Sequence, residues 1–214
     1  MILTVGGEKG GPGKSTVATT MAAMRAATGR QVLLVNADAQ STSVHWSAAR
    51  RDHPEVPQVT TVTMRGPKVH TEIADMAKRF EDVVIDTGGH DCVELRSALV
   101  ASDRLLMPLR PSQPDIWTLE KMAEIVEQVG TVNDRLRCFL FVNQVPTVSR
   151  DRLRQAMVEV MESWPQFHLL KTAWMFRAAF AAAIGEGLTV HEMKPRDGKA
   201  AAEASFLYGE VFEQ

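Results

Sequence analysis

Two lysines lie five residues apart in one glycine-rich stretch near the start of the chain. The stretch reads Lys9-Gly10-Gly11-Pro12-Gly13-Lys14-Ser15-Thr16. Glycines allow consecutive backbone N–H groups to point at one anion, and the positive end of a helix dipole adds to the attraction. A lysine in the position of Lys14 supplies a full charge to the β- and γ-phosphates, and the next hydroxyl, that of Ser15, is a ligand for Mg²⁺. These residues therefore predict a phosphate-binding loop for a nucleoside triphosphate.

The segments on either side of this loop support the prediction. An apolar run, residues 2–5, precedes the loop, and a helix-like run, residues 16–28, follows it. Strand, glycine-rich turn and helix in that order are the context in which the motif has meaning. The strict motif begins with a glycine six residues before its lysine, and Glu8 occupies that position here. The pattern is broken at one residue, while Gly13-Lys14-Ser15 and the context are kept.

Two aspartates follow apolar runs that are typical of buried strands. Asp86 ends the run 82–86 and is followed by Thr87-Gly88-Gly89. A carboxylate at a strand end can hold Mg²⁺ directly or through water, so Asp86 is interpreted as a metal-binding acid. Asp38 follows the run 31–36, where a turn-forming aspartate would also be expected.

The nucleobase is inferred from residues that are missing. A guanine-binding site would place Asn-Lys-x-Asp after a strand, whereas residues 143–146 read Asn-Gln-Val-Pro. Because the lysine and the acid are absent, adenine is favoured, and the expected nucleotide is ATP with Mg²⁺.

Apolar runs and amphipathic runs alternate along the chain. Continuous aliphatic runs are typical of buried parallel strands, and apolar residues at helical spacing indicate the helices between them. The predicted strands are 2–5, 31–36, 59–64 (short or at an edge), 82–86, 104–109, 138–143 and a short one near 169–173. The predicted helices are 16–28, 68–80, 93–101, 116–129, 150–164, 176–184 and 198–212.

This alternation predicts an α/β fold. We expect a P-loop NTPase-like, mainly parallel, twisted sheet with helices on both faces and right-handed crossovers. Ligands of such folds bind at the carboxyl ends of the strands, where the loop and both aspartates would meet. The chain has 214 residues without an internal repeat or linker, so a single domain over residues 1–214 is expected.

The second lysine is unusual, because an ordinary P-loop needs only one. The run from Lys9 to Thr16 resembles the deviant Walker A box of the ParA/MinD family of ATPases, and is most similar to its small ParA-type partition members. Residues 36–40 resemble that family's Asp-x-Asp-Pro-Gln, with Asn36 in place of the first acid. Residues 101–108, 176–190 and 199–203 also look like later elements of the family, so the resemblance covers nearly the whole chain.

The resemblance implies a role for each site residue. Lys9 would reach across an ATP-dependent homodimer to the partner's phosphates, and Asp38 would position the attacking water. Lys14 would act on the phosphates of its own subunit, and Mg²⁺ would be held by Ser15 and Asp86. The nucleotide contacts would come from Gly10, Gly11, Gly13, Lys14, Ser15, Thr16 and Asn143.

Several alternatives stay open at these positions. Lys9 could be a solvated loop lysine, and Asn143 could be a turn residue as readily as a contact to the base. Asn36 could hydrogen-bond a metal-bound water in place of the missing acid.

The family's activity provides the functional expectation. The resemblance implies a slow ATPase that dimerises on ATP, binds nonspecific DNA and is released when a ParB-like centromere-binding or adaptor protein stimulates hydrolysis. Residues 205–214 contain acids and neither lysine nor arginine, so membrane binding through a basic C-terminal helix is not expected. Candidate cations for DNA phosphates are Arg50, Arg51, Arg150, Arg154, Lys194, Arg196 and Lys199. The alternatives are a family member that positions a protein cargo, and a metabolic P-loop kinase or ligase.

Composition fits this expectation. The chain is 45% apolar and 23% charged with a net charge of −2, which is ordinary for a globular protein and argues against a histone-like one. Cys92 and Cys138 lie far apart and fit reduced structural thiols. No signal peptide is recognisable, and no apolar run approaches the roughly 20 residues of a membrane span. We therefore expect a cytoplasmic protein that associates with the nucleoid when ATP is bound.

Overall fold

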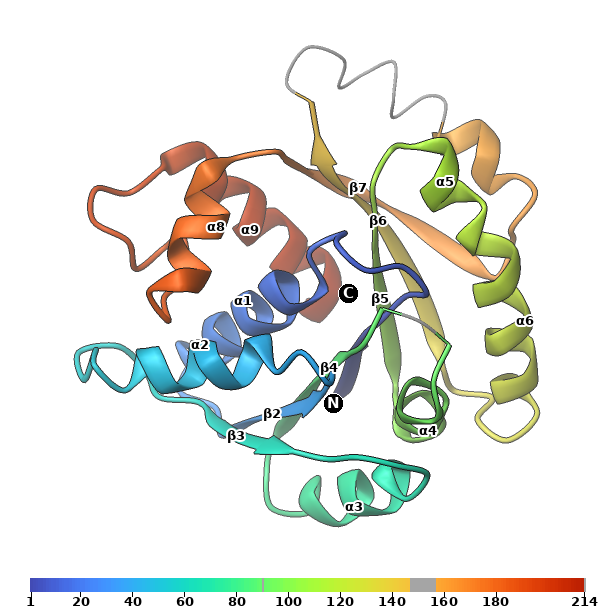
Figure 1. Cartoon of the computed structure of the whole chain (residues 1–214), viewed down its shortest axis with the longest axis horizontal. Helices are drawn as coiled ribbons and strands as arrows, with labels where there is room; N and C mark the ends of the chain where they lie inside the picture. The colour runs from blue at the N-terminus through green and yellow to red at the C-terminus, as the bar shows by residue number, and fades with distance from the viewer. Residues whose placement is uncertain (90, 147–156, 214) are drawn as a thin grey trace.

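The computed structural model describes residues 1–89, 91–146 and 157–213 (Figure 1). Within these residues, seven strands form one sheet in which all neighbouring strands are parallel. In spatial order they are β3 (Thr60–Thr63), β2 (Val32–Ala37), β4 (Asp82–Thr87), β1 (Ile2–Val5), β5 (Arg104–Leu109), β6 (Arg137–Val145) and β7 (Phe167–Met175). The expected P-loop NTPase-like parallel sheet is confirmed, and β3 is an edge strand.

The central strands are buried on both faces. Side chains of a strand point alternately to opposite faces, so a strand covered on both sides is apolar at nearly every position. In β2, Leu33 and Val35 belong to one core cluster, whereas Val32 and Leu34 belong to another on the opposite face. This explains why these strands read as continuous apolar runs.

Helices cover both faces of the sheet (Figure 1). One face carries α1 (Lys14–Ala26), α2 (Thr42–Arg50), α8 (Ala178–Gly185) and α9 (Gly198–Phe212). The other carries α3 (Val69–Met76), α4 (Val93–Ala101), the short α5 (Gln113–Ile116) and α6 (Thr118–Gly130). The loops after β1, β2 and β4 lie next to one another because these three strands are neighbours in the sheet.

Some element boundaries differ from the sequence prediction. The helix α2 was not predicted, the predicted helix 116–129 consists of α5 and α6, and β7 is longer than expected. The predicted helix 176–184 begins at Ala178, because Arg177 is still extended. In the predicted helix 150–164, residues 157–161 are helical, and residues 150–156 lie outside the described ranges.

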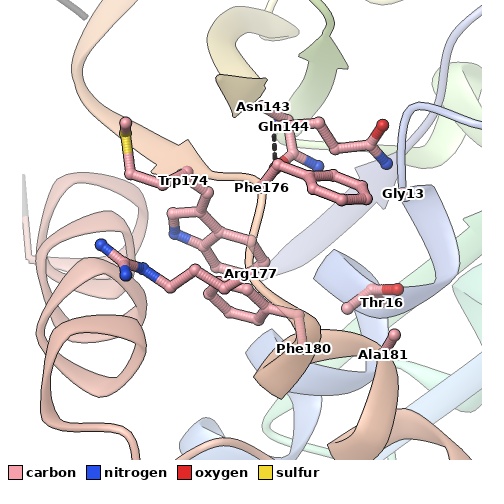
Figure 2. Close-up of a pocket in the computed structure, with 10 residues that line it drawn as sticks. Gly13, Thr16, Asn143, Gln144, Trp174, Phe176, Arg177, Phe180 and Ala181 are labelled. Atoms are coloured by element: carbon pink, nitrogen blue, oxygen red, sulfur yellow. Dashed lines mark hydrogen bonds between the residues drawn. The ribbon is translucent and has the colours of Figure 1, made fainter. Parts of the chain in front are cut away.

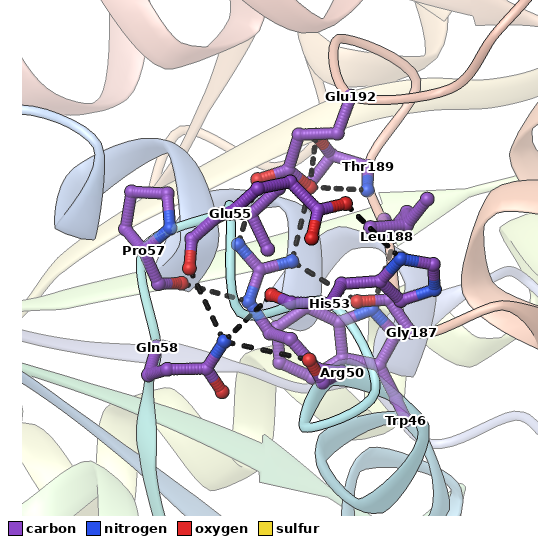
Figure 3. Close-up of polar contacts among 11 residues, drawn as sticks. Trp46, Arg50, His53, Glu55, Pro57, Gln58, Gly187, Leu188, Thr189 and Glu192 are labelled. Atoms are coloured by element: carbon purple, nitrogen blue, oxygen red, sulfur yellow. Dashed lines mark hydrogen bonds and ion pairs between the residues drawn. The ribbon is translucent and has the colours of Figure 1, made fainter.

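Arg50 is a buried tether (Figure 3). Its side chain is 1% exposed, and its guanidinium lies 2.6 and 3.0 Å from the two carboxylate oxygens of Glu192. It also donates to the carbonyls of Pro57 and Gly187, at 2.9 and 3.0 Å. A buried charge is stable only when it is paired and hydrogen-bonded, so Arg50 fastens α2 to the segment after α8. The expectation that Arg50 contacts DNA is therefore wrong; its neighbour Arg51 is exposed.

The two cysteines are free thiols. Burial raises the pKa of Cys138 to about 12 and also raises the pKa of Cys92, so both thiols are protonated at neutral pH. No helix in the described ranges combines the length and apolar character needed to cross a bilayer.

Candidate nucleotide-binding site

The glycine-rich loop joins β1 to α1 at the carboxyl edge of the sheet. The helix begins at Lys14, directly after Gly13, whose φ of 89° lies in the left-handed region. A Cβ at Gly13 would also lie 2.7 Å from Nδ2 of Asn143, so both conformation and space require glycine there. The loop therefore places backbone N–H groups at the positive end of the α1 dipole, which favours an anion.

A cleft of about 540 Å³ opens over this loop. Its lining brings together the loop, the start of α1, the segment after β2, the segment after β4 and the end of β6. The lining residues are Gly10, Gly11, Gly13, Lys14, Ser15, Thr16, Asp38, Ala39, Gln40, Gly89 and Gln144. All but one of the predicted nucleotide contacts and one of the two predicted aspartates thus face one cavity.

Lys14 is the buried cation of the cleft. Its side chain is 6% exposed, and Nζ donates to the carbonyl of Lys9 at 2.7 Å. Burial lowers the pKa of Lys14, while the nearby carboxylates of Asp86 and Asp38 oppose that shift. A desolvated ammonium beside a cleft attracts an anionic group more strongly than a solvated one, because the local dielectric constant is lower.

Asp86 lies beneath the cleft with its carboxylate unsatisfied. It is fully buried, and neither oxygen has a hydrogen-bond partner within the described ranges. Burial raises the pKa of Asp86 to about 6, although the hydroxyls of Ser15 and Ser43 and the charge of Lys14 act in the opposite direction. An orphaned buried carboxylate next to a serine hydroxyl fits a divalent cation.

The donor set fits Mg²⁺ better than a cation held by protein alone. Among the described residues, no group of three histidine, cysteine or acidic side chains could hold a metal. Mg²⁺ is commonly bound through one or two carboxylates, with water and substrate phosphates completing its shell. Ser15 and Asp86 are the residues that would hold it.

Asp86→Asn should stabilise the nucleotide-free protein at neutral pH. The folded pKa of about 6 lies above the unfolded value near 4, so the wild type loses unfolding free energy as pH rises from about 4 to about 6. The variant should gain on the order of 3 kcal/mol of unfolding free energy at pH 8, and this gain should vanish near pH 4. Urea denaturation at both pH values measures it, with exposed Asp134→Asn as the control. A variant less stable than wild type at pH 8 would contradict the assignment.

Asn36 organises the segment that carries Asp38. Its Oδ1 accepts from the amide of Asp38 at 3.2 Å and from Ser43 at 3.3 Å. Its Nδ2 donates to Ser41 and Thr63, each at 3.4 Å. Both donors and both acceptor positions of the amide are therefore used within the chain, which does not favour the open alternative of a hydrogen bond to a metal-bound water. Asn36 instead holds the segment after β2 against β3.

Asp38 has a partly exposed side chain at the cleft. One carboxylate oxygen accepts from the amide of Gln40 at 3.0 Å, which fixes the orientation of the side chain. The carboxylate is therefore held at the cleft by the turn that follows it.

Lys9 is held by its own subunit. Its Nζ lies 3.5 Å from a carboxylate oxygen of Asp115, which is 1% exposed, while the lysine side chain is 35% exposed. Asp115 is also 3.3 Å from Nε of Arg110 and accepts from the hydroxyl of Ser112. Arg110 would still compensate the buried carboxylate of Asp115 if Lys9 moved away.

Asn143 and Gln144, at the end of β6, brace the loop. Nδ2 of Asn143 donates to the carbonyl of Pro12 at 2.6 Å, and its Oδ1 accepts from the amide of Gln144 at 2.8 Å. Gln144 has a φ of 56° and donates from Nε2 to the carbonyl of Gly11 at 3.0 Å. Asn143 is thus committed mainly to the loop backbone, and its contact to the base remains a prediction.

A second, smaller cavity of about 100 Å³ lies on the other side of Gly13 and Thr16 (Figure 2). Its floor includes Trp174 stacked on Phe180, with ring centroids 4.3 Å apart. Phe176 also lines it, yet its side chain is 72% exposed. Asn143 and Gln144 complete the wall, so the cavity combines aromatic surface with side-chain amides, which suits an aromatic base.

Sequence analysis did not identify several residues that shape the site. Gln144, Arg110, Asp115 and Phe176 bind or face the loop from distant parts of the chain. Gln144 directly follows the end of a predicted strand, and side chains at that place in a parallel sheet commonly face the ligand site. The others have no local pattern, because the loop that they face is far away from them in sequence.

Comparison with known proteins agrees with this geometry. Residues 3–190 match the model of the CobQ/CobB/MinD/ParA nucleotide binding domain. The chain is 30% identical over 212 residues to the maintenance of carboxysome distribution protein A of Halothiobacillus neapolitanus, covering 98% of this chain and 95% of that protein. It is 22% identical to Protein ParA of Rhizobium radiobacter, covering 94% and 90%.

A solved structure shares the fold. An alanine variant of McdA from Cyanothece in complex with ATP superposes with a TM-score of 0.76, covering 99% of this chain and 96% of that one, at 16% identity.

Proposed function

Because the chain belongs to the CobQ/CobB/MinD/ParA family of nucleotide-binding domains, we propose that it is an ATPase that dimerises on binding ATP and Mg²⁺. In that state it associates with nonspecific DNA, and a partner protein releases it by stimulating hydrolysis. Residues 1–214 act as one ATPase domain. The observation that carries the proposal is the meeting of Lys14, Ser15 and Asp38 at one cleft above the unsatisfied carboxylate of Asp86.

The residues of the site divide the work of phosphoryl transfer. Mg²⁺ held by Ser15 and Asp86 would neutralise the charge that develops on the phosphates. Lys14 and the loop amides hold the phosphates, Ser15 and Asp86 hold the cation, and Asp38 orients the attacking water. Lys9 leaves Asp115 and reaches the phosphates of the second subunit, where a further cation stabilises the transition state.

The cargo has two candidates. The relative at 30% identity is named for carboxysome distribution, which favours a protein assembly as the cargo. The more distant ParA relative favours a plasmid or chromosome with a ParB-like partner. In both cases the ATP-bound dimer and its DNA association would be the same, so the partner decides between them.

Light scattering after size-exclusion chromatography tests the nucleotide step. The wild type should elute as a monomer without nucleotide and as a dimer with ATP and Mg²⁺. Lys14→Ala should stay monomeric under both conditions, because the buried cation that holds the phosphates is gone. A wild type that remains monomeric with ATP and Mg²⁺ would contradict the proposed function.

DNA association is tested on the dimer at several salt concentrations. Lys194, Arg196 and Lys199 are exposed and are the described candidates together with Arg51; Arg150 and Arg154 lie outside the described ranges. The triple alanine variant of Lys194, Arg196 and Lys199 should bind DNA more weakly, with a salt slope reduced by about 0.9 for each DNA phosphate that the variant leaves without a cation. A matched triple variant of Lys68, Lys78 and Arg79, exposed around α3 on the opposite face, should bind like wild type. Equally weakened binding in both variants would contradict the proposed surface.

A further inference from the structure

Arg65, in the loop between β3 and α3, forms hydrogen bonds with the backbone of the segment that carries Asp38. One guanidinium nitrogen donates to the carbonyl of Asn36 at 2.8 Å, and another donates to the carbonyl of Asp38 at 2.6 Å. The first nitrogen also donates to the carbonyl of Met64 at 2.9 Å. The guanidinium is a rigid planar fork, so it fixes two carbonyls that lie two residues apart relative to each other.

These contacts act on the backbone at the point where Asp38 leaves the sheet. The carbonyl of Asp38 also accepts from the amide of Ser41 at 3.0 Å, which closes the turn after Asp38. Ser41 has a φ of 57°, a conformation that a residue other than glycine adopts at some cost. Contacts from other segments therefore stabilise the turn, and the charged contact is the hydrogen bond from the Arg65 guanidinium to the carbonyl of Asp38.

The loop that carries Arg65 is also tied to the helix after Asp86. The amide of Gly66 donates to Glu94 at 2.9 Å, in the first turn of α4. That hydrogen bond lowers the pKa of Glu94, and the charge of Arg65 acts in the same direction. Ser97 of α4 donates to the carbonyl of Pro67 at 2.9 Å and accepts from the amide of His70 at 2.9 Å. Residues 65–70 therefore contact both the segment after β2 and the helix that follows β4.

We propose that Arg65 is a positioning residue for hydrolysis. It holds the carboxylate of Asp38 in a fixed position relative to α4, the helix that follows Asp86. The inference rests on the proposed function. It assigns Arg65 to the turnover step and not to ATP binding, because the guanidinium contacts the backbone of the Asp38 segment and does not line the cleft. A small displacement of a group that positions a reactant reduces the rate strongly while leaving binding intact.

Steady-state ATP hydrolysis by Arg65→Met tests the proposal on the full chain. We expect kcat to fall about 10-fold and KM for ATP to change less than about two-fold, since the interaction that is removed acts in the transition state. Arg65→Lys keeps the charge, but its ammonium can reach only one carbonyl at a time. Its kcat should therefore lie between those of the wild type and Arg65→Met. Glu94→Gln should lower kcat in the same direction and by less.

Hydrogen exchange of the nucleotide-free protein supplies a second readout. The amide of Ser41 should exchange faster in Arg65→Met than in wild type, whereas amides in β1 and β4 should be unchanged. Arg79→Met, an exposed arginine of the segment after α3, is the matched control and should alter neither readout.

Each outcome bears on the proposal. Wild-type kcat in Arg65→Met, or a raised KM with kcat unchanged, would overturn it. Faster exchange across β1 and β4 together with the reduced rate would assign Arg65 a general structural role and also overturn it. A wild type that hydrolyses no ATP would overturn the proposed function itself, and the inference with it.

Discussion

Replacing Asp38 with alanine is expected to lower the rate of ATP hydrolysis by about 10³-fold, because the attacking water would no longer be positioned, a loss comparable to that of a general base. The carboxylate lies at the cleft, and a backbone hydrogen bond from Gln40 orients it. Nucleotide binding should persist, because the loop amides, Lys14 and the Asp86 site are untouched. ATP-bound dimers should therefore accumulate and dissociate slowly.

Two measurements on the Asp38→Ala variant separate these expectations. Phosphate release gives kcat, and binding of a fluorescent ATP analogue gives affinity. Asp134→Asn, an exposed aspartate on the connection after α6, is the control and should match wild type. An unchanged kcat, or a loss of affinity as large as the loss of rate, would show that Asp38 does not serve the hydrolytic step.

Lys9→Ala is expected to leave ATP affinity largely intact and to reduce partner-stimulated hydrolysis by about 100-fold, below the range seen for arginines supplied in trans. The side chain of Lys9 is partly exposed and pairs with Asp115, whereas the side chain of Lys14 is buried. Loss of Lys9 leaves Asp115 with Arg110 and Ser112, so the fold should tolerate the change.

Lys121→Ala is the matched control for Lys9→Ala. Lys121 is exposed, and its Nζ lies 3.9 Å from Glu8 beside the same loop. The Lys121→Ala variant should hydrolyse ATP like wild type. Both Lys9→Ala and Lys121→Ala should unfold at the wild-type temperature. If Lys9→Ala hydrolysed ATP normally, the chain would behave as a simple P-loop enzyme such as a kinase or ligase.

The fold was largely predictable because strands that are buried on both faces are apolar at nearly every position. The continuous apolar run of β2 and the acid at the end of β4 identified both elements and their order. The same sequence did not reveal α2. The positions that α2 buries are Ser43, Trp46, Ser47 and Arg50, which have helical spacing but are mostly polar.

Arg50 and Arg65 show where a single sequence fails. Both are arginines in polar surroundings, and one was interpreted as a surface cation. Their partners, Glu192 for Arg50 and the carbonyls of Asn36 and Asp38 for Arg65, are brought near only by the fold. Local sequence patterns predict which residues are in the core and which form the glycine-rich loop. Side-chain contacts with groups that are far away in sequence leave no such local pattern.

The most direct test of the mechanism mixes Lys9→Ala and Asp38→Ala, the two variants expected to slow partner-stimulated hydrolysis, before ATP is added. In a mixed dimer, the site with an intact Asp38 would face the subunit with an intact Lys9, so one site is complete. Equal amounts should restore about a quarter of the wild-type rate, because half of the two-fold symmetric dimers are mixed and each has one complete site. No recovery, while light scattering confirms that mixed dimers form, would contradict the claim that Lys9 acts across the dimer.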